Sequence, residues 1–285
     1  MRIITFSGIR GGFNGTNDGK EIIQFAQDLA AALPATTAPV YDGIKGHDHF
    51  ISEVNWSTLL GESGLATVLD GSPALNEEAA KVAPVAAEAI LQRTAATPDE
   101  PVVIIAHSQG TNNATFTVRH LLSQHADFFT DRPVRCLLLD PKVGPNHVTD
   151  VFATSGDLDL PFLFLQSDLD LLSNQGVLGS RFIDQFVLGD HLYVAGLGHN
   201  DIEDWDMLDQ AKLRWLTRPE YQDKYLRALE KERLRLRQER GKPGWTTMDE
   251  LKIEKFKKAY AMNTGPLTPA VLQFAQGRLA QRYES

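Results

Sequence analysis

The chain has 285 residues, 42% of them apolar and 23% charged, a composition typical of a folded globular protein rather than a disordered one. Its length suits one large α/β domain with an appendage, or two small domains, and its formal net charge of −9 argues against a general nucleic-acid binder. No apolar run approaches the roughly 18 residues that a membrane span requires.

Short apolar runs alternate with helix-like segments along the first three quarters of the chain. Strands are expected at residues 2–6, 38–41, 102–106, 134–139, 161–166 and 191–196, and helices at 19–33, 76–97, 109–123, 179–188 and 202–216. This alternation predicts right-handed crossovers and a mostly parallel sheet that is covered by helices on both faces. Residues 43–72 are irregular and predict a long loop over the carboxyl edge of that sheet.

The charge is distributed unevenly. Residues 1–211 hold 11 Lys and Arg against 28 Asp and Glu, a formal charge of −17, whereas residues 212–285 hold 17 against 9, a charge of +8. The change predicts a main domain over residues 1–215 and a basic, helical C-terminal extension over residues 216–285. Acidic side chains interleave with the basic ones in the extension, which favours a solvated or intramolecular helix, and we expect it to dock on the acidic body.

The most informative stretch is V-V-I-I-A-H-S-Q-G, in which Ser108 lies between Ala106 and Gly110. It is a variant of G-x-S-x-G with alanine in the first position. A nucleophilic serine on a sharp strand-to-helix turn needs small residues two positions before and two after it, because larger side chains would collide with the neighbouring strand and helix. The alternative is that Ser108 only caps the helix that follows. The strand–turn–helix context favours the nucleophile.

A nucleophilic serine needs a base and a carboxylate that orients the base. Among the eight histidines, His199 alone follows the final predicted strand on a glycine-containing loop, G-L-G-H, and it is the expected base. The favoured carboxylate is Asp170, in S-D-L-D-L-L after the strand at 161–166. Asp168 in the same loop and Asp140, at the end of the strand at 134–139, remain alternatives.

The oxyanion formed by serine attack needs two preorganised N–H donors. One is expected from the backbone of Gln109, where a helix begins and its dipole favours negative charge. The other is expected from the glycine-rich loop after the first strand, S-G-I-R-G-G, and the Ile9 N–H is the candidate by position. That loop lacks the register of a phosphate-binding motif.

These residues and their order, Ser108 in A-H-S-Q-G, then an acid after a later strand, then His199, resemble the α/β-hydrolase superfamily over residues 1–215. The resemblance implies a three-layer α/β-hydrolase-like fold. The strand that is normally third in that superfamily comes first here, so the first hairpin is expected to be missing. The interval between Asp140 and Asp170 is too short for a large cap domain, and any lid must come from residues 43–72 or from the extension.

We therefore expect a serine acyl hydrolase of the esterase, lipase or thioesterase type, which acts on a small-molecule ester or a lipid. No cofactor or metal and no nucleic-acid partner are expected. A non-catalytic binding module of the same fold, whose basic tail docks a partner or an anionic surface, is the alternative. The single Cys136 lies in an apolar run and is expected to be buried. The N-terminal apolar stretch is too short for a signal peptide, so a cytoplasmic location is expected.

Overall fold

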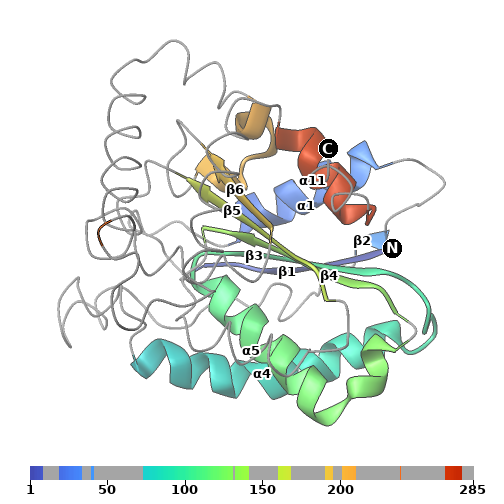
Figure 1. The fold of residues 1–285 in the computed structure, drawn as a ribbon. Coiled ribbons are helices and arrows are strands. Elements are labelled where there is room, and N and C mark those ends of the chain that lie inside the picture. The colour runs from blue at the N-terminus through green and yellow to red at the C-terminus, as the bar shows by residue number, and fades with distance from the viewer. Residues whose placement is uncertain are drawn as a thin grey trace.

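Within the residues that the structure describes, six parallel strands form one sheet at the centre of the molecule (Figure 1). The computed structural model describes residues 1–8, 19–33, 40–41, 73–130, 132–140, 160–167, 190–194, 201–209, 238 and 267–277. The strands are β1 (Arg2–Phe6), β2 (Val40–Tyr41), β3 (Val102–His107), β4 (Val134–Leu139), β5 (Phe162–Ser167) and β6 (Asp190–Val194). Their order is β2-β1-β3-β4-β5-β6, and every pairing among them is parallel. The chain is thus an α/β protein, as its sequence predicts.

Helices cover both faces of this sheet (Figure 1). One face carries α4 (Pro73–Thr94), α5 (Gln109–Gln124) and the short η2 (Ala126–Phe129), and the other carries α1 (Lys20–Ala32), η3 (Asp201–Glu203) and α11 (Leu267–Ala275). Within β1, β3, β4 and β5 the apolar side chains alternate between two clusters. In β3, for example, Ile104 belongs to the α4–α5 side and Ile105 to the α1–α11 side. Burial on both faces explains why these strands are almost continuously apolar.

The helices of the described residues present apolar stripes of helical spacing to the sheet. In α1 the buried positions are Ile22, Phe25, Ala26 and Leu29, and such an i, i+3, i+4, i+7 pattern places them on one face. The helix α11 buries Val271 and Phe274 in the same cluster. Residues 267–275, which belong to the predicted C-terminal extension, therefore pack on the same face of the sheet as α1.

Most predicted elements within the described residues are present, with ends shifted by a few positions. The prediction of a helix over 179–188, the irregular loop at 43–72 and the domain boundary near residue 215 lie outside the described residues. Cys136 is buried in β4, as expected, and burial raises the pKa of its thiol.

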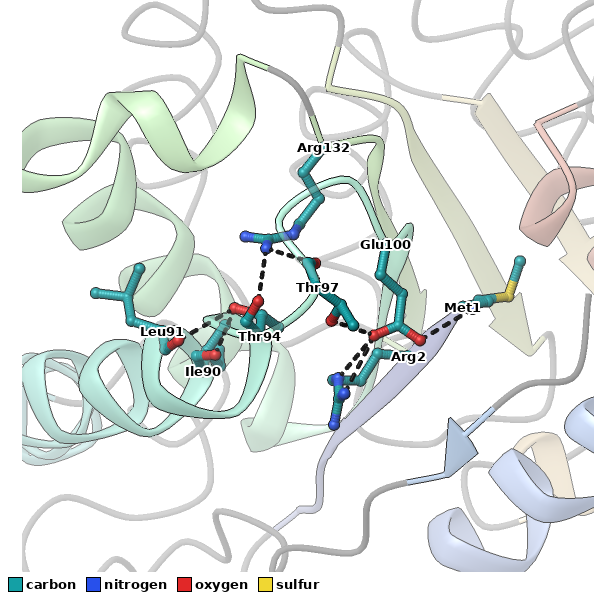
Figure 2. A network of polar contacts seen from close by, with 8 residues as sticks. All are labelled: Met1, Arg2, Ile90, Leu91, Thr94, Thr97, Glu100 and Arg132. Carbon is teal, nitrogen blue, oxygen red and sulfur yellow. Dashed lines mark hydrogen bonds and ion pairs between the residues drawn. The ribbon is translucent and has the colours of Figure 1, made fainter.

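A polar network ties the amino ends of β1, β3 and β4 together (Figure 2). The Glu100 carboxylate receives Arg2 Nη2 at 3.1 Å, the N-terminal ammonium at 3.2 Å and the Thr97 hydroxyl at 2.8 Å. Arg132 Nη2 donates to the carbonyl oxygens of Thr94 and Thr97, both at 3.0 Å. Burial acts to raise the pKa of Glu100, but the Thr97 hydrogen bond and the two nearby positive charges outweigh it, so this pKa lies below its ordinary value.

Candidate functional site

The strand order reverses at β1, and this reversal marks where a ligand is expected to bind. From β1 the chain first adds β2 on one side and then places β3 on the other side. In open α/β sheets, ligands bind in the crevice outside the carboxyl ends of the strands at such a point. Phe6 at the end of β1 is in register with Ala106 of β3, so the segments that follow both strands start side by side. Ser108 lies on one of them.

Ser108 adopts a strained backbone conformation, with φ 51° and ψ −126°. Such angles lie outside the regions that residues with a β-carbon ordinarily adopt, and they cost on the order of 1–3 kcal/mol. Three hydrogen bonds hold the peptide groups on either side of Ser108 in place. Its N–H donates to the Leu139 carbonyl at 3.0 Å, and its carbonyl accepts from the Thr111 N–H at 3.0 Å and hydroxyl at 2.6 Å.

The side chain of Ser108 is not used as a helix cap. Ser108 occupies the position before α5, yet its hydroxyl makes no capping hydrogen bond. A capping serine normally has an extended backbone and accepts a bond from an N–H of the first turn. Within the described residues, the geometry thus favours the strained-turn interpretation of the A-H-S-Q-G motif over the capping one.

Gly110 is required by the close approach of β1 to the start of α5. A β-carbon at this position would lie 2.5 Å from the carbonyl oxygen of Ser7, 2.6 Å from the carbonyl carbon of Phe6, and in collision with the Phe6 oxygen. All three atoms are backbone, which cannot rotate away as a side chain can. The physical reason for a small residue two positions after the serine, anticipated from the motif, is therefore present.

The expected oxyanion donors lie only partly within the described residues. Gln109 is the first residue of α5, where the helix dipole places its positive end. The loop that carries Ile9 begins at Ser7, whose carbonyl approaches Gly110, but Ile9 itself lies outside the described residues. The start of this loop thus lies against the turn that carries Ser108.

The ends of β4, which neighbours β3, and of β5, the next strand in the sheet, could supply the acid. Asp140 follows β4 directly, is fully buried, has a positive φ of 40°, and donates its N–H to the Leu165 carbonyl at 2.8 Å. Because His107 pairs with Leu139 in the sheet, Asp140 occupies the position beside Ser108. Asp168, Asp170 and His199 lie outside the described residues, but Asp168 and Asp170 follow β5, and His199 follows β6.

One pair near this turn was not anticipated from the sequence. His107, the residue before Ser108, places Nδ1 2.9 Å from Oε2 of Glu203 in η3, with exposed side-chain fractions of 1% and 5%. A pocket of about 670 Å³ lies on the same face between α1 and η3 and is lined in part by Glu203, Phe25 and Trp205. Ser108 is not among its lining residues, so the pocket and the serine are separate features.

Comparisons of this chain with protein-family models, with curated proteins and with solved structures found no match. The fold and the residues above therefore carry the functional argument by themselves. In the part of the chain that the structure describes, none of the helices has the length and hydropathy of a membrane span.

Proposed function

We propose that this protein is a serine hydrolase with an α/β-hydrolase-like fold and that it cleaves carboxylic esters or thioesters through an acyl-enzyme on Ser108. The observation that carries the proposal is the conformation of Ser108. A non-glycine residue with φ 51° sits at the switch point of a parallel sheet, directly before a helix, with a hydroxyl that is not engaged as a cap. Backbone strain of this kind persists only where surrounding contacts enforce it, and it clusters at functional sites.

In this mechanism His199 removes the proton from Ser108 Oγ as the hydroxyl attacks the ester carbonyl, and later returns it to the leaving alcohol or thiol. Asp170 orients the imidazole and stabilises its cation. We favour Asp170 over Asp140 because β5 and β6 are neighbours with Ser167 in register with Val194, so Asp170 and His199 follow adjacent strand ends. The Gln109 and Ile9 N–H groups stabilise the oxyanion.

His199 has enough chain to reach the serine. Between β3 and β6 lie three strand spacings, which together amount to roughly 14 Å. The five residues from Val194 to His199 span up to about 17 Å when extended.

The substrate is a small ester or a lipid whose acyl group is held at the carboxyl edge of the sheet. The proposed setting is the reducing cytoplasm, which suits a chain with a single cysteine.

The test is labelling with a fluorophosphonate probe, followed by peptide mapping of the modified residue. We expect the label on Ser108, and we expect Ser108→Ala to lose both the label and hydrolysis of a short p-nitrophenyl ester by about 10³-fold or more. Ser123→Ala is the matched control, because Ser123 is an exposed serine on the same helix. Labelling that persists in folded Ser108→Ala would remove Ser108 as the nucleophile and overturn the proposal. A folded wild type that neither takes the label nor hydrolyses the ester would favour a binding module.

A further inference from the structure

The buried pair of His107 and Glu203 links two segments that are 96 positions apart. His107 ends β3 and belongs by alternation to the same face as Val103 and Ile105, the face covered by α1, η3 and α11. Glu203 ends η3, whose Ile202 is fully buried in that cluster. The two polar side chains therefore meet inside an otherwise apolar layer.

A buried carboxylate is costly unless it is paired, and apolar side chains of similar volume often stabilise a fold equally well or better. Packing alone thus gives no reason to place Glu203 here. In some proteins a buried polar pair is retained because its directional contact fixes the relative position of the two segments that carry it.

The two members of the pair lie close in sequence to the two predicted catalytic residues. His107 precedes Ser108, and Glu203 comes four residues after His199. Four residues of extended chain span at most about 14 Å, so a fixed Glu203 limits how far His199 can lie from the strand that carries Ser108. Displacement of a reacting group by about 1 Å can reduce the rate by about 10²-fold.

We propose that His107 and Glu203 are positioning residues, whose buried contact fixes the chain after His199 against the strand end that carries Ser108. The inference rests on the serine hydrolase function proposed above. Neither side chain touches the substrate. Their effect is on the alignment of imidazole and hydroxyl, so it falls on kcat rather than on KM.

The main experiment replaces the pair by His107→Leu with Glu203→Leu, which keeps the layer apolar and filled. We expect a folded protein with thermal stability equal to or above that of the wild type, kcat for a p-nitrophenyl ester lower by about 10-fold or more, and KM within about twofold of the wild type. If the pair has a purely structural role, activity follows stability, and a double variant as stable as the wild type keeps the wild-type kcat. Asp206→Asn is the control, because it removes an exposed carboxylate three residues from Glu203 and should leave kcat unchanged.

If the double variant does not fold, Glu203→Asp tests whether the pair positions the catalytic residues. It keeps the carboxyl group but withdraws it from His107 by roughly one bond length, and we expect the same selective loss of kcat. A folded variant with wild-type kcat overturns the inference while leaving Ser108 as nucleophile. If the wild type itself shows no Ser108-dependent labelling or hydrolysis, both proposals fail together.

Discussion

Replacing Gly110 by alanine tests whether the close approach of β1 shapes the turn that carries Ser108. Two opposite effects are expected at this position. Gly110 lies in the first turn of α5, and an alanine in a helix is ordinarily more favourable than glycine by about 1 kcal/mol. The added β-carbon, however, would lie 2.5 Å from the Ser7 carbonyl oxygen. The sign of the change in the free energy of unfolding therefore tells which effect dominates.

We expect the contacts with β1 and Ser7 to dominate, so that Gly110→Ala lowers the free energy of unfolding. To bring the Ser7 oxygen to the 3.4 Å of ordinary contact, the start of α5 and the end of β1 must separate by roughly 0.9 Å. Forced separation of packed elements typically costs about 1–3 kcal/mol. The same movement shifts Ser108, which is two residues away, so we expect a loss of ester hydrolysis by about 10²-fold as well.

Urea unfolding and steady-state kinetics measure both effects. Gly277→Ala is the comparison, because Gly277 has a φ of 77° and its added β-carbon would meet the flexible end of the Arg135 side chain, far along the chain from the turn. That variant should lose some stability and keep its kcat. A Gly110→Ala protein that is as stable as the wild type or more stable would refute the argument from the β1 contact.

Four further outcomes are expected. Ser108→Gly should be more stable than Ser108→Ala by about 1 kcal/mol in urea unfolding, since glycine adopts a positive φ without strain, and equal stabilities would argue against strain at this residue. Asp170→Asn should lower kcat by about 10⁴-fold and Asp140→Asn only mildly, and the reverse ranking in folded variants would assign the acid to the end of β4. Glu100→Gln should destabilise the fold by about 1–2 kcal/mol at neutral pH. Because the folded-state pKa of Glu100 is lowered from 4.5, this difference should persist above that pH and shrink as the pH falls below it, and a difference independent of pH in thermal unfolding would contradict the assignment. Phe274→Ala should cost about 3–4 kcal/mol, because the ring is buried against the sheet, and a change under about 1 kcal/mol would show that α11 does not stabilise the core.

The strands were predictable from sequence because burial on both faces leaves a signal in every residue. Runs such as V-V-I-I and L-L-L have few solvated positions, and their ends agree with β3 and β4 to within a residue. The turn at Ser108 was predictable for a related reason. Its geometry demands a small residue at 110, and that demand is local enough to appear as a motif.

Contacts between distant segments were not predictable in the same way. The short helix η3 has three residues, too few for a periodic pattern, and nothing in D-I-E-D indicates which carboxylate turns inward. The pairing of Glu203 with His107 depends on how η3 lies against the sheet, which is a property of the whole fold. The sequence predicted helices in the segment that contains α11, but it could not predict the place of α11 beside α1, because any apolar stripe of that width fits several sheet positions.

The two ends of β3 differ in their contribution. Contacts at the amino end stabilise the fold, whereas the carboxyl end leads into the strained turn, and the two ends lie far apart. At its amino end Glu100 joins the starts of β1 and β3 through charges and hydrogen bonds, whereas at its carboxyl end Ser108 holds a strained turn. The six residues of β3 separate these ends by about 20 Å. Over such a distance the energetic effects of substitutions are independent. The stabilising contacts at the amino edge can therefore offset the strain at Ser108 without constraining the geometry of the site, and variation there changes stability while leaving the turn intact.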